Sequence, residues 1–330
     1  MTKGAAIFGV AGPDLRPDEH AFFREYDPVG FILFARNVES PTQIQRLTSD
    51  LRQCVGRDAP ILIDQEGGRV ARLGAPYWRE WLPPLEHAEG TKDAERALYL
   101  RYRIIAEELR ALGITVNCAP CADIAYDQTH PFLQNRCLGR RADQVISRGR
   151  AVAKGLLDGG VLPVLKHIPG HGRAQSDSHK ELPFVDASQR DLLESDFKVF
   201  KALHDIPMGM TAHVVYRGMH QTLPATTSHE MISVIRDELG FQGLLMTDDL
   251  SMNALRGTVV ERTVGALAAG VDVILHCNGN LAEMRDVAEA AEGLTDIADR
   301  RFQRAMDHLS LSEFSDISAM EAELQNLYTA

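Results

Sequence analysis

The sequence lacks a long hydrophobic run and an excess of basic charge. No apolar stretch approaches the ~20 residues that a membrane-spanning helix needs, so we expect no membrane association. The apolar stretch near the N-terminus is too short for a secretory signal, and no small-residue cleavage site follows it. We therefore expect a cytoplasmic protein. Acidic residues outnumber basic ones by 46 to 35, for a net charge of -11, which argues against nucleic acid as a partner because phosphate binding needs a basic surface.

Cysteine is also scarce, and its spacing excludes a disulfide framework. Cys118 and Cys121 have the two-residue spacing of redox and zinc motifs, but they end an apolar, strand-like run and no second pair completes a zinc site. We expect buried, reduced thiols at all five positions. These are Cys54, Cys118, Cys121, Cys137 and Cys277.

What the sequence has is a regular alternation of short apolar strands and amphipathic helices. Strands that are almost wholly apolar and separated by helices predict a parallel sheet covered on its faces. Eight such units fit a closed (β/α)₈ TIM barrel. A doubly wound open sheet is the main alternative, but no G-x-G-x-x-G follows the first strand and no Walker sequence occurs. The expected strands cover residues 4–10, 29–34, 60–64, 114–120, 162–166, 208–213, 244–248 and 271–276.

We expect one domain over residues 1–330, because no linker, repeat or low-complexity tract divides the chain. The first strand could be irregular, with a long connection to the second. Residues 281–330 are expected to form a helical tail on the outside of the barrel. Thr91, Ser188 and Ser228 are the expected starts of three helices, and Gly113 and Gly240 end the first and third.

The most informative segment is residues 166–172 (KHIPGHG), which follows an apolar strand. It places a lysine and two histidines on a loop shaped by Pro169, Gly170 and Gly172, and residues 177–179 (DSH) add a third histidine. Active sites of α/β proteins form where strands end in such loops. The alternative is an ordinary surface loop that happens to be rich in histidine.

Other strand ends carry polar residues as well. Singly, each has a structural explanation: Asp64 or Asp123 could cap a helix, His213 could be a core histidine, and Arg69 could pair with a neighbouring Glu. Together, the polar ends of the second to seventh strands predict a polar pocket with fixed donors and acceptors for a hydroxyl-rich ligand such as a sugar. The residues expected to bind it are Asp64, Arg72, Arg136, Lys166 and His167.

Asp248 and Asp249 end the seventh strand. Asp248 shares the two-residue register of Leu244 and Met246, so it points into the barrel if they do. Asp249 would then point towards the helices. Asp248 is accordingly the expected nucleophile or charge stabiliser, and Asp249 the structural partner.

Glycoside hydrolysis normally needs a second carboxyl group. The candidate here is a pair, Asp177 and His179, in which an imidazole with a pKa near neutrality can donate and then accept a proton. The carboxylate beside it would orient the ring. A plain turn is the alternative for this tripeptide, since Asp and Ser favour turns.

Four segments in order resemble the signatures of glycoside hydrolase family 3, and in particular its bacterial single-domain β-N-acetylglucosaminidases of cell-wall recycling. They are residues 64–70 (DQEGGRV), 166–172, 177–179 and 247–252 (TDDLSM), and the likeness runs from about residue 30 to 277. The chain departs from the pattern at Ile168, at residues 173–176 and at Cys137-Leu138.

The resemblance implies a retaining exo-β-N-acetylglucosaminidase. Asp248 corresponds to its nucleophile, His179 to its acid/base and Asp177 to the partner of that histidine. The sugar-binding positions correspond to Asp64, Arg72, Arg136, Lys166 and His167. The implied substrate is GlcNAc–1,6-anhydro-MurNAc with or without its peptide. We expect a monomer with neither a metal nor an organic cofactor.

Three alternatives remain open at this stage. The substrate's acetamido oxygen could attack while Asp248 and Asp249 orient it. A metal-dependent barrel hydrolase could use His167, His171, Asp177 and His179, although Lys166 would place a cation beside the metal. A non-catalytic sugar-binding protein is the third.

Overall fold

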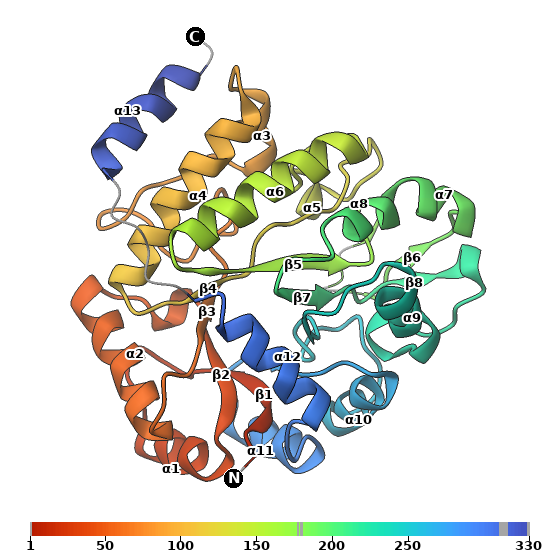
Figure 1. Ribbon diagram of the computed structural model, residues 1–330. Helices are drawn as coiled ribbons and strands as arrows, with labels where there is room; N and C mark the ends of the chain where they lie inside the picture. The colour runs from red at the N-terminus through yellow and green to blue at the C-terminus, as the bar shows by residue number, and fades with distance from the viewer. Residues whose placement is uncertain (1, 177, 179–180, 310–315, 329–330) are drawn as a thin grey trace.

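The computed structural model describes residues 2–176, 178, 181–309 and 316–328. Eight parallel strands form one sheet in the order β10-β1-β2-β3-β4-β5-β7-β9. A parallel bridge between Met246 and Val273 joins β9 to the start of β10 and closes the sheet into a barrel. The predicted TIM barrel is therefore confirmed (Figure 1). Its strands are β1 (Gly4–Gly9), β2 (Pro28–Leu33), β3 (Ile61–Ile63), β4 (Val116–Asn117), β5 (Leu162–Ile168), β7 (Met208–Thr211), β9 (Leu244–Met246) and β10 (Ile274–His276).

Each observed strand overlaps one of the eight predicted segments, and several are shorter than predicted. Segment 114–120, for example, pairs as a strand only at Val116–Asn117. Residues 118–120 are buried and lead into the loop after β4. The first strand is paired on both sides, with β10 and with β2, and has one register shift between Gly4 and Ile7.

Helices surround the barrel and cover its outer face (Figure 1). Their apolar stripes pack on strands that are buried along their whole length, as expected for a parallel sheet. The α-helices are α1 (Pro17–Tyr26), α2 (Pro41–Val55), α3 (Pro84–Glu89), α4 (Ala94–Ala111), α5 (Pro131–Gln134), α6 (Ala142–Asp158), α7 (Gln189–Glu194), α8 (Asp196–Ala202), α9 (His229–Ser233), α10 (Val259–Ala269), α11 (Leu281–Ala290), α12 (Asp296–Met306) and α13 (Ile317–Leu327). Short 3₁₀ segments span Ala35–Asn37, Arg217–Met219 and Ala225–Thr227, and a π-helical turn spans Val234–Glu238.

Two of the three predicted helix starts are confirmed. Ser188 and Ser228 cap α7 and α9, each accepting a hydrogen bond from a backbone N–H three residues later. The start at Thr91 is wrong. The helix begins at Ala94, and Asp93 is the cap, because its carboxylate accepts from the N–H of Arg96 at 3.0 Å. Thr91 instead forms a backbone bridge with Tyr328.

The C-terminal helices lie on the outside of the barrel. α11 packs against β1 and α10, while α13 packs along α4, far from the N-terminus (Figure 1). Arg96 of α4 pairs with Glu323 of α13 at 2.6 Å. Within the described ranges, no helix is both long and apolar enough to cross a membrane.

A second, two-stranded sheet lies beside the carboxyl end of the barrel. It consists of β6 (Phe184–Val185) and β8 (Val215–Tyr216), which run parallel. The hydroxyl of Tyr216 donates to the carbonyl of Gly170 at 2.6 Å. These contacts anchor both ends of the long loop that follows β5.

Candidate active site

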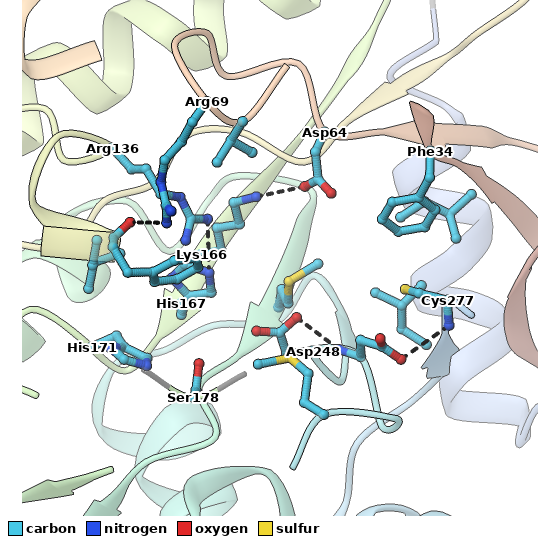
Figure 2. Close-up of a pocket in the computed structure, with 18 of the residues that line it drawn as sticks. Phe34, Asp64, Arg69, Arg136, Lys166, His167, His171, Ser178, Asp248 and Cys277 are labelled. Carbon is cyan, nitrogen blue, oxygen red and sulfur yellow. Dashed lines mark hydrogen bonds and ion pairs between the residues drawn. The ribbon is translucent and has the colours of Figure 1, made fainter. Parts of the chain in front are cut away.

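A cavity of about 320 Å³ opens at the carboxyl ends of the barrel strands. The alternating chain path places the polar loop after every strand at this end, which is where barrel enzymes bind their ligands. Figure 2 shows its polar side chains converging from loops that are far apart in the sequence. The cavity is lined by Ile32, Phe34, Asp64, Arg69, Val70, Arg72, Phe132, Leu133, Arg136, Lys166, His167, His171, Ser178, Met210, Asp248, Asp249, Met252, Leu275 and Cys277.

Two carboxylates on the loop after β3 hold the cations of the cavity. Asp64 accepts from Lys166 Nζ at 2.9 Å and from Arg72 Nη2 at 3.1 Å. Glu66 lies behind it and binds Lys166 Nζ at 2.6 Å and Arg136 through two parallel hydrogen bonds of 2.9 and 2.8 Å. Lys166 therefore bridges Asp64 and Glu66, and the side chains of Lys166 and Glu66 are almost wholly buried.

Electrostatics keeps this cluster ionised despite its burial. Burial by itself raises the pKa of Glu66, but the charges of Arg136 and Lys166 outweigh that effect and lower the pKa to about 2. Burial likewise opposes ionisation of Asp64, and Lys166 and Arg72 lower its pKa well below the ordinary range. Burial lowers the pKa of Lys166, yet its two carboxylates raise the net value above normal. The cluster is thus charged at neutral pH.

His167 is oriented by a buried aspartate. Its Nδ1 lies 2.7 Å from Asp123 Oδ2, and its Nε2 lies 3.4 Å from an Arg136 nitrogen. Because arginine can only donate, this arrangement suits a ring that carries its proton on Nδ1. The pKa of Asp123, which burial would raise, is lowered to about 2 by His167 and His171. Asp123 also accepts from the backbone N–H of His171 at 2.6 Å.

The two aspartates after β9 differ in what they bind. Asp249 accepts from Ser251 Oγ at 2.6 Å, from Ser251 N at 3.0 Å and from Cys277 N at 3.1 Å. Asp248 Oδ1 accepts from the N–H of Asp249 at 2.8 Å. The expectation that Asp249 points towards the helices is wrong, since both residues line the cavity. β9 ends at Met246, so the alternation of side chains does not extend to these residues.

Sequence reasoning missed the roles of two carboxylates. Glu66 and Asp123 both appeared in polar segments after strands, but nothing in the sequence showed that Glu66 would be buried against Arg136 and Lys166. The Nη2 of Arg69 donates to the carbonyl of Phe132 at 2.6 Å.

His213 is a core histidine, as its structural explanation proposed. It is buried, its Nδ1 lies 2.7 Å from the hydroxyl of Thr226, and its Nε2 lies 3.1 Å from the carbonyl of Asp249. Burial lowers its pKa. Through its contact with the Asp249 carbonyl, His213 supports the loop that follows β9.

One group of side chains in the described part of the chain has metal-ligand spacing. Cys121 Sγ, Asp123 Oδ2 and His167 Nδ1 lie within 4.8 Å of one another. The thiol and the imidazole already hydrogen-bond to the same carboxylate oxygen, at 3.4 and 2.7 Å. This set shares only His167 with the ligands considered from the sequence.

Asp177 and His179 lie outside the described residues. Ser178, which stands between them in the chain, is buried and lines the cavity. All the other predicted site residues meet in this cavity, namely Asp64, Arg72, Arg136, Lys166, His167 and Asp248.

A closed (β/α)₈ barrel with a sugar-sized polar cavity and a carboxylate beside it is the arrangement of barrel glycosidases. Residues 12–311 match the model of the glycosyl hydrolase family 3 N-terminal domain. The chain is 35% identical over 299 residues to a β-hexosaminidase of Methylococcus capsulatus, covering 88% of this chain and 87% of that one. A β-hexosaminidase of Nitrosomonas eutropha is 32% identical over 287 residues, with 84% and 82% covered.

Solved structures agree with these relatives. NagZ from Neisseria gonorrhoeae in complex with N-trifluoroacetyl-D-glucosamine superimposes with a TM-score of 0.86 at 28% identity, over 100% of this chain and 99% of that one. The chain belongs to glycosyl hydrolase family 3. It is a glycoside hydrolase with β-N-acetylhexosaminidase activity, of the β-N-acetylglucosaminidase type. The resemblance noted from the motifs is confirmed.

Replacing Glu66 by glutamine should weaken substrate binding. The amide keeps the shape but removes the charge that holds Arg136 and Lys166, and a hydrogen bond to a charged group contributes about 1.5–3 kcal/mol. We expect kcat/KM on an aryl N-acetylglucosaminide to fall about 10- to 100-fold, at tenfold per 1.4 kcal/mol. Glu89→Gln is the matched control, because Glu89 makes an exposed pair with Arg140. A Glu66→Gln enzyme within twofold of the wild type would contradict this role.

The depressed pKa of Glu66 also predicts how stability depends on pH. Its folded pKa of about 2 lies below the ordinary 4.5, so the unfolded state binds the proton first as the pH falls. The stabilisation is therefore present above pH 4.5 and is lost progressively towards pH 2. Urea unfolding between pH 6 and 3 should show a shallower loss of unfolding free energy in Glu66→Gln than in the wild type. An identical pH dependence in both proteins would refute the assignment.

Proposed function

We propose that the protein is a retaining exo-β-N-acetylglucosaminidase that removes terminal non-reducing GlcNAc from peptidoglycan fragments. The proposed substrate is GlcNAc–1,6-anhydro-MurNAc, with or without its peptide. The observation that carries the proposal is the juxtaposition of Asp248 with the Asp64–Lys166–His167 set in one small cavity. The names of the relatives support N-acetylglucosamine as the sugar. We further propose that the protein acts as a cytoplasmic monomer.

In this proposal the ionised cluster binds the hydroxyl and acetamido groups of the terminal sugar. Asp64 is the acceptor, because its charge is maintained by Lys166 and Arg72. Lysine has three N–H donors, and two of those on Lys166 are directed to Asp64 and Glu66. The third can reach the ligand. Arg72, Arg136 and His167 complete the proposed set, with His167 oriented by Asp123.

The proposed reaction has two steps. Asp248 attacks the anomeric carbon while His179, oriented by Asp177, protonates the leaving oxygen, so that a glycosyl-aspartate forms and the aglycone departs as an alcohol. His179 then takes a proton from water, the hydroxyl attacks the anomeric carbon, and Asp248 is released as a carboxylate. No metal or organic cofactor takes part.

Substrate-assisted hydrolysis by an Asp248–Asp249 pair has less support. The carboxylate of Asp249 already accepts three hydrogen bonds from Ser251 and Cys277. It is therefore occupied in holding the loop, whereas the proposal needs only one acting carboxylate, that of Asp248.

Asp248→Ala should nearly abolish turnover, with a loss in kcat of roughly 10⁴–10⁶-fold, the scale on which loss of an essential catalytic group acts. Asp249→Ala should lower kcat by a factor at least about tenfold smaller, because Asp249 acts only by holding the loop that carries Asp248. Both variants are compared by steady-state kinetics on the same aryl glycoside, with circular dichroism to check folding. Equal losses in the two variants, or a loss in Asp249→Ala alone, would show that Asp248 is not the nucleophile.

His179→Ala should affect substrates according to their leaving groups. General acid assistance is worth about 10²–10⁴-fold, so a natural disaccharide should be slowed on that scale, while an activated aryl glycoside still forms the intermediate. Azide should then accelerate turnover and give a β-glycosyl azide, detectable by mass spectrometry. Asp177→Ala should show a milder form of the same pattern. If the rates on both substrates fall equally and azide does not restore turnover, His179 is not the acid/base.

Chelation should leave activity unchanged. The charged Lys166 lies beside His167, which makes the cavity unfavourable for a divalent cation. Activity after dialysis against EDTA is compared with that of untreated enzyme, and Cys121→Ala tests the thiol of the Cys121–Asp123–His167 group. Loss that zinc restores would place the protein among metallohydrolases.

A further inference from the structure

Arg101 of α4 is buried behind the loop that follows β3. Its Nη2 donates to the backbone carbonyl of Glu66, and its guanidinium carbon lies 5.4 Å from the centre of the Trp81 ring and 5.5 Å from that of Tyr102. The loop makes room for it, because Gly67 has a φ of +106° and a Cβ there would collide with the Arg101 side chain. Arg101 is not one of the residues that line the cavity, so it contacts the loop and not the ligand.

This arginine brings its charge into the interior without an ion pair. Among the residues that the structure describes, no carboxylate pairs with it, and its Nε and Nη1 have no hydrogen-bond partner. Burial lowers the pKa of Arg101, but an arginine stays protonated in a protein, and an unpaired buried charge costs free energy. The Glu66 carbonyl is also satisfied without it, since the Tyr102 hydroxyl donates to the same oxygen at 3.1 Å. Packing alone therefore does not account for a guanidinium at this position.

The helix α13 packs along α4, which carries Arg101, and reaches the same group of side chains (Figure 1). The Tyr328 hydroxyl lies 2.9 Å from His87 Nδ1, and the two rings meet edge to face with their centres 5.5 Å apart. The His87 ring meets Trp81 in the same way at 6.5 Å, and the Trp81 carbonyl accepts from the N–H of Gly68 at 2.8 Å. A continuous set of contacts thus runs from α13 to the loop after β3.

We infer that Arg101 is a positioning residue for the sugar-binding cluster and that α13 holds it in place. Glu66 directs its carboxylate to Arg136 and Lys166, while its carbonyl is held by Arg101. Both ends of one residue are thereby fixed, and Lys166 passes the position on to Asp64. This inference rests on the proposed function, in which the cluster binds the terminal sugar. A binding group that is only loosely supported from behind loses affinity for its ligand.

Arg101→Met tests the positioning role, because methionine fills much of the space without the charge or the donor. On an aryl N-acetylglucosaminide we expect KM to rise about tenfold while kcat stays within about threefold, the pattern of lost uniform binding. Arg101→Lys keeps the charge and a donor, so it should restore part of the KM. The midpoint of urea unfolding of Arg101→Met should stay at the wild-type value or rise, because the unpaired buried charge is gone.

Arg52→Met is the matched control. Arg52 lies on α2 and likewise donates to two backbone carbonyls, those of Ala59 at 3.1 Å and Gly113 at 2.7 Å. Ala59 precedes β3, so this arginine holds the opposite end of the same strand. Its replacement should leave KM at the wild-type value. A folded Arg101→Met enzyme whose KM rises no more than that of Arg52→Met would overturn the inference.

Coupling to Glu66 separates positioning from a general loss of packing. In a double-mutant cycle, Arg101→Met should change KM by less than about twofold once Glu66→Gln is present, because Arg101 acts through Glu66. Independent effects, in which the two changes in KM multiply, contradict the inference. If Arg101→Met does not fold, the same cycle is measured with Arg101→Lys.

Tyr328→Ala tests the part played by α13. It removes the contact with His87, and we expect KM to rise about threefold with kcat unchanged. In a Trp78→Phe background, the fluorescence of Trp81 should also shift to longer wavelength, because water reaches the indole. Glu323→Gln is the control on the same helix, since it breaks only an exposed pair with Arg96 and should change neither quantity. Equal KM values in Tyr328→Ala and Glu323→Gln would show that α13 does not hold the site.

Failure of the proposed function gives a different result. If Glu66→Gln itself leaves KM unchanged, the cluster does not bind the sugar, and the proposed binding set fails together with the inference. If Glu66→Gln raises KM and Arg101→Met does not, only the inference fails.

Discussion

The carboxylate of Glu66 is the contact on which the rest of the site depends. It binds Arg136 and Lys166 at the same time, and these cations come from the loop after β4 and from β5. Behind it, Tyr102 donates to the Glu66 carbonyl at 3.1 Å, and Arg101 donates to the same oxygen. One buried acidic side chain thus fixes three segments of the barrel around the cavity.

Burying several charges together is expensive unless each is paired, because desolvation can exceed the attraction of a single pair. Here the charges form a chain in which Arg72 binds Asp64, Lys166 bridges Asp64 to Glu66, and Glu66 binds Arg136. Each charge therefore lies beside an opposite charge, and these pairings favour the ionised forms of Asp64, Glu66 and Lys166. Such a fixed set of donors and acceptors does not need to reorganise when a polar ligand arrives, which is the physical basis of electrostatic preorganisation.

Much of this organisation could be predicted from the sequence. The eight strands were recognisable because the apolar runs are short and bounded by helix signals, and the residues after them could be placed at one end of the barrel by the parallel topology alone. The pairing of the charged side chains with one another could not be predicted from the sequence. Nothing local distinguishes Glu66, which is buried against two cations, from Asp64, which faces the cavity. The predicted direction of the Asp249 side chain was wrong because the alternation of side chains along a strand was extended past the end of β9 at Met246. Thr91 and Asp93 are both good capping residues and lie within one turn of the helix, so residue type alone does not show which of them is the cap.

The most direct test of the account is to trap the proposed intermediate. A fluorinated GlcNAc donor with a good leaving group, whose hydrolysis step is slowed, should raise the intact mass of the enzyme by one glycosyl unit. Peptide mapping should place that unit on Asp248, and the Asp248→Ala variant should remain unlabelled. Labelling of another residue, or turnover of the natural disaccharide through an oxazoline product without any enzyme-bound sugar, would contradict the account.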